Sequence, residues 1–492
     1  MNKKIFITII ILSSILVGCA GSTPASTLPT PTQEATTAPV TSDPSTPTMT
    51  ATPVEVLEYS KYSIDLTLDY DSKQAQVSEI IRYQNNTGVE LNDLVIAVEP
   101  NLWDGCFSLK SISLDGDTIT SFELDGQRLT IPFKMVMQQI VEITINYDLS
   151  IPRIEVDDKA TIIRTQVFGY TARQMNLVDW YPFVVPHNKG EGWLLNEPAT
   201  YGEHLVYDSA DFQVKVHFAG DITPVTAASG SLEPSSGDDD VYTLEKGRSF
   251  AISFSPDYLL KTQEVEGISV QSYYFTGADL AGQAALDATV QAIKIYTQDY
   301  GPYQHSTLSI VQEETAFSME YDGLYFLERP LYYGYSGQFT DTLPTIAAHE
   351  TAHQWWFALV GTDQANQPWL DEALATYSER LFNESISPEK AAWWQAWRLY
   401  LQEDYHCPID ITIYGFYNYG CYYTQSVYVR GAMFMQSLRD LVGDEAFFSF
   451  IKDFATRFAH QIASTSDFFA VLKEHTDKDL SGIMQEYFKG TY

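Results

Sequence analysis

Cysteine is scarce in this sequence. The 492 residues include four cysteines, and no two of them form a CxxC pair. Nothing in their spacing indicates a thiolate metal site. Cys407 and Cys421 bracket a tyrosine-rich segment, and the sequence leaves open whether they form a disulfide or remain two free thiols. Cys106 is expected to be a small buried hydrophobe.

Positive charge is scarce as well. The chain has 29 Lys and Arg against 64 Asp and Glu, which gives a formal net charge of −35 at pH 7. A chain this acidic is not expected to bind nucleic acid, or to dock on anionic lipid through a basic patch. The acidity is explained by a solvated surface, or alternatively by electrostatic steering of cationic peptides toward the protein.

Apolar runs long enough to span a bilayer are missing. The run Ile5–Val17 follows two lysines and is too short to cross a membrane, which is the layout of a signal peptide. It leads into the sequence LVGC at residues 16–19, which resembles a bacterial lipobox. The sequence therefore predicts a signal peptide over residues 1–18 and lipid attachment at Cys19. The alternative is an ordinary signal peptide with a coincidental cysteine.

The segment after the leader has almost no charge and no aromatic residue. Residues 20–54 are dominated by Ser, Thr and Pro, and such a composition cannot bury a core. We expect residues 19–55 to be a lipidated, disordered stalk. Leader and stalk together predict an extracytoplasmic protein that is anchored to the bacterial cell membrane by its lipid alone.

The rest of the chain has two halves of different pattern. From residue 56 to about residue 260, short alternating segments are separated by turn residues, which indicates a largely antiparallel, β-rich domain. The clearest predicted strands are Tyr62–Leu68, Gln76–Tyr83, Val141–Tyr147 and Phe212–Phe218. The histidines of this half, His187, His204 and His217, have no ligand spacing and are expected to be structural or on the surface.

Residues 261–492 have the pattern of a mainly helical domain. Leu280–Tyr300 carries an apolar helical stripe between the predicted strands Gly267–Phe275 and Ser306–Gln312. A helix from about Thr342 to Gly361 and another from Trp369 to about Asn383 are joined by a loop. The expected fold class is therefore multidomain α+β.

These two joined helices carry the strongest chemical signal. His349 and His353 are four residues apart, so both imidazoles project from one helix face, and Glu372 follows after eighteen intervening residues. Two imidazoles and one carboxylate form a catalytic type of zinc site, because three protein ligands leave a fourth position for water. Glu350 lies inside this HExxH motif and can act as a general base. We predict one Zn²⁺ per chain.

Four stretches of the sequence resemble the M1 family of zinc aminopeptidases, which are gluzincins. They are SMEY, HETAHQWW, PWLDEALATYSE and YVRG. The resemblance covers most of the chain after Leu57. It implies an antiparallel β-rich N-terminal domain over residues 56–260, followed by a thermolysin-like, mainly helical catalytic domain over residues 261–492. It also implies that His349, His353 and Glu372 bind zinc and that Glu350 activates water.

The resemblance implies two further residues that contact the substrate. Glu320 corresponds to the glutamate of the family's GxMEN motif, which binds the free α-amine, although Phe, Ser and Tyr stand here where Gly, Ala and Asn are common. Tyr428 corresponds to the tyrosine that stabilises the oxyanion. The first-domain glutamine that helps to bind the amine in some relatives cannot be placed. Because the chain ends soon after Tyr428, a more open active site than in larger relatives is expected.

The sequence thus predicts a zinc-dependent aminopeptidase. Its substrates would be extracytoplasmic peptides with a free N-terminus, and it would hydrolyse their first peptide bond. One alternative is a zinc endopeptidase with an open cleft. Another is a non-catalytic surface binding lipoprotein, against which the intact HExxH motif and Glu372 both count.

Overall fold

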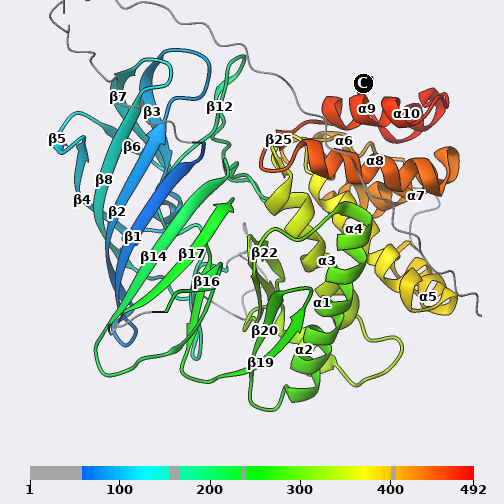
Figure 1. The fold of residues 1–492 in the computed structure, drawn as a ribbon, viewed down its shortest axis with the longest axis horizontal. Helices are drawn as coiled ribbons and strands as arrows, with labels where there is room; N and C mark the ends of the chain where they lie inside the picture. Colours follow the sequence, from blue (N-terminus) through cyan, green and yellow to red (C-terminus); the bar gives the residue numbers. More distant parts are fainter. Residues whose placement is uncertain (1–57, 155–166, 235–236, 238, 400–405) are drawn as a thin grey trace, which may run out of the picture. The chain divides into compact units, whose positions relative to one another are not determined.

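The computed structural model describes residues 58–154, 167–234, 237, 239–399 and 406–492 (Figure 1). The expected signal peptide, the lipid attachment at Cys19 and the stalk lie outside the described residues. Among the described helices, none combines the length and the apolar character needed to cross a membrane.

The first half of the chain is built on a large, mostly antiparallel sheet. Alternating burial along β1 shows why these residues form strands, since every second side chain enters the core. β1 pairs with β14 in parallel, and the other neighbouring strands of this sheet pair antiparallel. The expected β-rich, largely antiparallel fold is therefore confirmed. The strands, in sheet order, are β16 (Ser231–Leu232), β17 (Asp240–Gly247), β14 (Ala210–Ala219), β1 (Ser60–Asp69), β2 (Gln74–Gln84), β8 (Ile140–Ser150), β4 (Phe107–Leu114) and β5 (Asp117–Ile119).

Smaller sheets complete this half. One has the order β15 (Val225–Ala228), β18 (Ile252–Ser255), β10 (Met175–Leu177) and β9 (Gly169–Tyr170). Another has the order β11 (Phe183–Val184), β3 (Leu91–Ala97), β7 (Arg128–Met135) and β6 (Glu123–Asp125), and β12 (His187–Asn188) pairs with β13 (Gly192–Trp193). A short 3₁₀ turn, η1 (Glu99–Leu102), follows β3. Aliphatic and aromatic side chains from all three larger sheets form one continuous buried core.

The second half begins with a mixed sheet and continues as helices. The sheet order is β19 (Tyr258–Val265), β20 (Ile268–Phe275), β21 (Thr307–Gln312), β23 (Leu324–Leu327) and β22 (Met319–Tyr321). The helices are α1 (Asp279–Tyr300), α2 (Arg329–Gly334), α3 (Leu343–His353), α4 (Trp369–Ile386), α5 (Pro388–Leu399), α6 (Phe416–Tyr419), α7 (Gly431–Val442), α8 (Asp444–Arg457), α9 (Thr465–His475) and α10 (Ser481–Tyr487). The expected order of a β-rich region followed by a mainly helical region is therefore confirmed.

The sheet of the second half starts before the division expected between residues 260 and 261. β19 begins at Tyr258 and pairs along its whole length with β20. The division into domains stays a prediction, and Tyr258 is the first residue whose strand belongs to the second half's sheet.

The helix expected over Thr342–Gly361 is interrupted. α3 ends at His353, and the chain continues as a wider π-helical turn, η2 (Gln354–Leu359), before β24 (Gly361–Thr362), which pairs with β25 (Ile462–Ala463). The aromatic residues Trp355, Trp356 and Phe357 are consecutive and all buried in η2. A wider turn lets three successive large side chains enter the core, and single π turns of this kind are frequent at functional sites. A second one, η3 (Gln425–Arg430), precedes α7.

Candidate metal centre and active site

The expected metal ligands converge from two helices. His349 and His353 lie on the same face of α3, and their Nε2 atoms are 3.1 Å apart. Glu372 lies in the first turn of α4, and its Oε2 atom is 3.4 Å from Nε2 of His349 and 3.6 Å from Nε2 of His353. All three side chains are at least nine-tenths buried. The structure thus brings together the residues that the HExxH motif and the later glutamate predicted.

The spacing of these three atoms fits a zinc ion. Zinc binds imidazole nitrogen at about 2.0–2.1 Å and carboxylate oxygen at about 2.0–2.2 Å in a tetrahedron, which puts neighbouring ligand atoms about 3.3 Å apart. The observed separations of 3.1, 3.4 and 3.6 Å scatter around that value. Oε2 of Glu372 is buried and makes no hydrogen bond, as expected of an atom that is free to bind a metal.

The charges around the imidazoles also favour a cation. Burial by itself lowers the pKa of His349, but contacts with Glu372 and Glu379 outweigh it and raise the pKa to about 10. The site therefore attracts positive charge strongly enough to hold an extra proton on an imidazole. A divalent cation at the same place would satisfy the same carboxylates.

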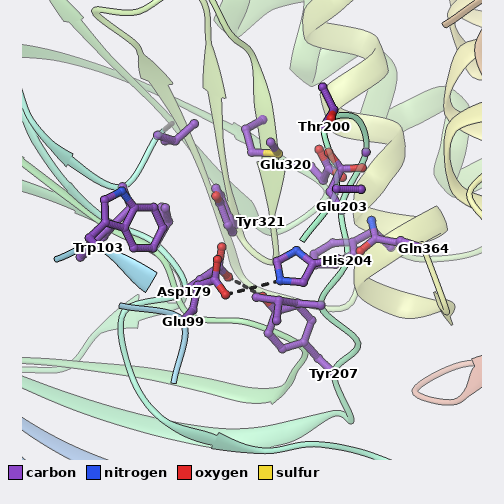
Figure 2. Close-up of a pocket in the computed structure, with 18 residues that line it drawn as sticks. Glu99, Trp103, Asp179, Thr200, Glu203, His204, Tyr207, Glu320, Tyr321 and Gln364 are labelled. Atoms are coloured by element: carbon purple, nitrogen blue, oxygen red, sulfur yellow. Dashed lines mark hydrogen bonds and ion pairs between the residues drawn. The ribbon is translucent and has the colours of Figure 1, made fainter. Parts of the chain in front are cut away.

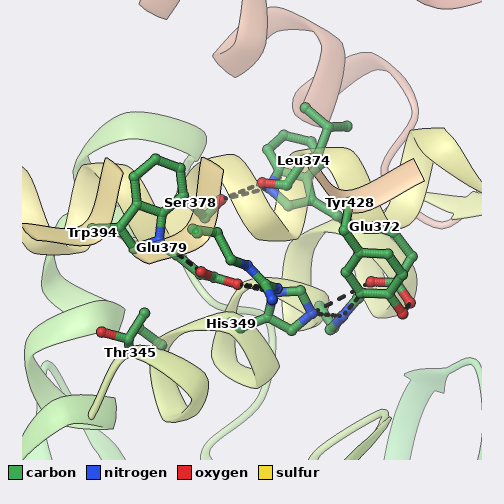
Figure 3. Close-up of polar contacts among 12 residues, drawn as sticks. Thr345, His349, Glu372, Leu374, Ser378, Glu379, Trp394 and Tyr428 are labelled. Carbon is green, nitrogen blue, oxygen red and sulfur yellow. Dashed lines mark hydrogen bonds and ion pairs between the residues drawn. The ribbon is translucent and has the colours of Figure 1, made fainter. Parts of the chain in front are cut away.

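A further carboxylate contacts Nδ1 of each histidine, the ring nitrogen that does not face the other ligands. Nδ1 of His349 is 2.9 Å from Oε1 of Glu379 (Figure 3). Nδ1 of His353 is 2.6 Å from Oδ1 of Asp371. Such outer carboxylates fix the imidazole orientation and leave Nε2 as the metal-binding atom. Sequence reasoning missed both residues. Glu379 follows Glu372 by seven residues, two turns along the same helix face, and that spacing was the available signal.

Glu350 lies beside the ligands without belonging to their set. Its carboxylate is within 4.8 Å of ligand atoms of His353 and Glu320, and its side chain is 4% exposed. Burial raises the pKa of Glu350 to about 7, although the neighbouring histidines act in the opposite direction. A carboxylate with a pKa near neutrality can both take up a proton and release it, which is what a general base in peptide hydrolysis requires.

Glu320 lies on β22, next to the metal ligands. It is 6% exposed, and its Oε1 atom makes no hydrogen bond. Burial, and then the charges of Glu203 and Asp371, raise the pKa of Glu320 well above its usual range. A buried carboxylate oxygen without a hydrogen-bond partner favours a cationic ligand at this position.

Glu203 is a site residue that sequence reasoning missed. Carboxylate oxygens of Glu203, Glu320 and Glu372 lie within 4.8 Å of one another, and Figure 2 shows the first two on one wall of a cavity of about 80 Å³. Glu203 comes from the segment before β14, far from the motifs, so no spacing in the sequence indicates it. A Cβ atom at the adjacent Gly202 would lie 2.9 Å from the hydroxyl of Tyr423.

The φ of Gly202 is 75°, a left-handed conformation that favours glycine, so this residue lets the segment that carries Glu203 approach the site closely.

Tyr428 reaches the metal ligands from η3. Its hydroxyl donates a hydrogen bond to Oε1 of Glu372, and its ring stacks on the imidazole of His349 with centroids 5.9 Å apart and an interplanar angle of 12° (Figure 3). Tyr428 therefore lies beside two of the residues that are expected to bind the metal. Its hydroxyl lies next to the atoms that would bind the metal and the substrate carbonyl.

The remaining expectations have mixed outcomes. Cys407 and Cys421, which the sequence left open, form a disulfide with Cα atoms 5.9 Å apart, and Cys106 is free and buried as expected. The three histidines of the first half do not join the metal ligands. His204 is buried and contacts Gln127 at 3.0 Å, and His217 forms an exposed contact of 2.8 Å with Asp239.

Comparison with known proteins agrees with this geometry. Residues 284–487 match the model of the "Peptidase family M1 domain". Aminopeptidase M1-C of Oryza sativa subsp. japonica is 29% identical over 239 residues, which cover 46% of this chain and 27% of the relative. The chain thus aligns with about a quarter of the length of the curated relatives that it matches.

Solved structures extend the likeness over nearly the whole chain. The M1 zinc metallopeptidase from Deinococcus radiodurans superposes with a TM-score of 0.63 at 17% identity, covering 88% of this chain and 94% of that one. A further structure of the Deinococcus protein, bound to a Tyr-Ser-Ala substrate, has a TM-score of 0.64 at 17% identity and covers 90% and 97% of the two chains. These likenesses establish the fold. Together with the domain match, they show that residues 284–487 are similar to a peptidase family M1 domain, within a chain that has the fold of an M1 zinc metallopeptidase.

Proposed function

We propose that the protein is a zinc-dependent aminopeptidase that hydrolyses the N-terminal peptide bond of peptides. The observation that carries this proposal is the juxtaposition of two groups of side chains. His349, His353 and Glu372 present three atoms at zinc-ligand spacing, and the carboxylates of Glu320 and Glu203 lie directly beside them. The names of the relatives, which are aminopeptidases or zinc metallopeptidases, support the same reaction.

The chemistry divides among the residues as follows. Bound zinc would supply a Lewis acid for the scissile carbonyl and lower the pKa of water. Glu350 takes the proton from the attacking water and passes it to the leaving amine, for which a pKa of about 7 is well suited. Tyr428 donates its hydroxyl hydrogen to the oxygen that becomes negative during the reaction.

The paired carboxylates explain why only the first peptide bond would be cut. Glu320 and Glu203 can hold the free α-ammonium group of a substrate, and this fixes the first carbonyl over the metal ligands. Glu203 thus fills the place of the glutamine that could not be found in the sequence. The cavity of about 80 Å³ next to Glu320 has room for the side chain of the first residue, since one water needs about 10–15 Å³ on the same measure.

One assay tests this function. Purified protein with zinc is given matched amino-acid amides with a free and with an acetylated amine, together with an internally quenched peptide that has a blocked N-terminus. We expect cleavage of the free-amine substrate only, abolished by a chelator and restored by zinc. Cleavage of the acetylated amide at a similar rate, or of the blocked peptide, would favour the endopeptidase alternative.

A variant of Glu350 checks the proposed general base. Glu350→Gln is expected to lower kcat by about 10²–10⁴-fold while zinc stays bound, because the residue moves protons and does not hold the metal. Metal content measured on the same sample separates the two effects.

Absence of any chelator-sensitive cleavage by the wild-type protein would favour a non-catalytic binding protein.

The proposed location is extracytoplasmic, on a lipid anchor. This proposal rests on the leader and on Cys19, and not on any described residue. Expression with a labelled fatty acid, followed by detergent phase partition, tests it. We expect label in the wild-type protein and none in Cys19→Ala, which should move to the aqueous phase. Equal labelling of both proteins would exclude Cys19 as the attachment site.

A further inference from the structure

Arg398 is a nearly buried cation behind the metal ligands that the proposed reaction does not use. It lies on α5, four residues after Trp394, so the two side chains share a helix face. Both bind the same carboxylate: Trp394 Nε1 donates to Oε2 of Glu379 at 2.7 Å, and Arg398 donates to Oε1 of Glu379 at 2.8 Å. Glu379 is fully buried, so these contacts replace its hydration.

The oxygen that Arg398 binds is the one that faces the metal ligand. Oε1 of Glu379 is 2.9 Å from Nδ1 of His349 (Figure 3). The same oxygen is 2.8 Å from the guanidinium of Arg398. The chain of contacts therefore runs from Arg398 through one carboxylate oxygen to the imidazole. A buried carboxylate stays ionised and in place only if a cation compensates it, and Arg398 is the arginine that contacts Glu379.

The second histidine is anchored differently. Behind His353, the carboxylate of Asp371 accepts a hydrogen bond from the neutral amide of Gln364 at 2.5 Å. The carboxylate next to His349 is thus bound by an arginine, whereas the carboxylate next to His353 is bound by a neutral amide. On that side Arg398 also approaches the ring of Tyr428, with its guanidinium carbon 5.8 Å from the ring centroid. One arginine therefore contacts both the anchor of His349 and the ring that stacks on His349.

We propose that Arg398 is a positioning residue of the metal site, which acts through Glu379 to orient the imidazole of His349 and through ring packing to orient Tyr428. This inference rests on the proposed zinc site. The residue would not touch the substrate. Its effect would appear as tighter zinc binding and, at saturating zinc, as a higher kcat.

The test measures zinc binding directly. Zinc-free protein is titrated against a chromogenic chelator, without substrate, for the wild type and for Arg398→Gln, Arg398→Lys and Arg380→Gln. Arg380 is the matched control, because its side chain likewise connects α4 and α5, here from α4 to Gln395 on α5 at 3.4 Å, and because it adjoins Glu379 in sequence. Thermal melting of the zinc-free proteins reports the packing of the two helices.

We expect Arg398→Gln to weaken zinc binding by about 10–100-fold, as the loss of outer-shell partners does at other zinc sites. Arg398→Lys keeps the charge and should lose less, and Arg380→Gln should bind zinc like the wild type. At saturating zinc, Arg398→Gln should retain a lower kcat with little change in KM. Zinc binding within twofold of the wild type in Arg398→Gln would overturn the inference. A wild-type protein that does not bind zinc would instead overturn the proposed function.

Discussion

Glu79 is a carboxylic acid in the core of the β-rich half. It lies on β2, it is completely buried, and neither of its carboxylate oxygens makes a hydrogen bond. Burial raises the pKa of Glu79 well above its ordinary value of 4.5. The folded protein therefore keeps this proton at pH values where the unfolded chain releases it. The stability that the residue allows is complete below about pH 4.5 and is lost as the pH rises toward the folded-state pKa.

Replacement of Glu79 by glutamine should remove this pH dependence. Glutamine has the shape of the protonated acid and no proton to release. Glu79→Gln is therefore expected to have a higher melting temperature than the wild type, and the difference should be larger at pH 8 than at pH 5. Calorimetric or fluorescence melting of both proteins at the two values gives the comparison. An equal difference at both values would show that Glu79 does not change its protonation on unfolding.

Tyr428 contributes a single hydroxyl to the proposed reaction. Because that hydroxyl acts on charge that develops only in the transition state, Tyr428→Phe is expected to lower kcat by about 10²–10³-fold with little change in KM. The phenyl ring should still stack on His349, so zinc binding is retained. Steady-state kinetics with a free-amine amide measures both parameters. A rise in KM at unchanged kcat would assign Tyr428 to substrate binding instead.

At the scale of elements, Gly431 sets how closely two helices approach. It opens α7, three residues after Tyr428, and a Cβ atom at this position would lie 2.3 Å from Cβ of Ala373 on α4. Ala373 follows Glu372, a proposed metal ligand. The contact therefore fixes the distance between the helix that carries Glu372 and the segment that carries Tyr428.

Gly431→Ala should push these elements apart. We expect a loss of about 1–3 kcal/mol in unfolding free energy from overpacking, with a fall in kcat because Tyr428 is displaced. Ala373→Gly in the same chain makes room and should restore both values in part. Gly482→Ala is the control, since nothing lies within 4 Å of a Cβ atom on this α10 residue. An unaffected melting temperature in Gly431→Ala would show that α7 can shift freely.

Elements with a strong periodic pattern could be predicted from the sequence, and contacts between distant segments could not. The apolar stripe of α1 and the alternation of β1 and β2 appear within a short window, so these elements were found to within a few residues. The three residues expected to bind the metal belong to one local motif, and the structure brings their side chains together. Glu203 and Arg398 carry no motif, and only the folded chain brings them to Glu320 and Glu379. The disulfide could not be predicted for the same reason, because its geometry depends on the folded chain, in which the Cα atoms of Cys407 and Cys421 are 5.9 Å apart.

At the scale of the whole described chain, Arg248 connects the two halves. It lies between β17 and β18, and its side chain is 2% exposed. The guanidinium donates to the carbonyl oxygens of Tyr207 in the first half and of Ala358, Leu359 and Gln461 in the second, at 2.7–3.3 Å. Burial lowers the pKa of Arg248 to about 10, against the opposing charges of Asp208 and Asp322.

Loss of this arginine should therefore destabilise the protein far more than loss of a surface arginine. Arg248→Met removes the arginine donor from four carbonyl groups, of which those of Leu359 and Gln461 keep a backbone donor, and it removes the cation near Asp208 and Asp322, so we expect a loss of about 3–5 kcal/mol. Ala358 and Leu359, two of the residues that lose this donor, belong to η2, which directly follows His353. The affinity of the variant for zinc should therefore fall as well. Arg457→Met, which removes surface ion pairs with Glu474 and Asp453, is the control and should destabilise the protein far less. Urea unfolding followed by tryptophan fluorescence measures both variants, and equal midpoints would mean that Arg248 does not hold the halves together.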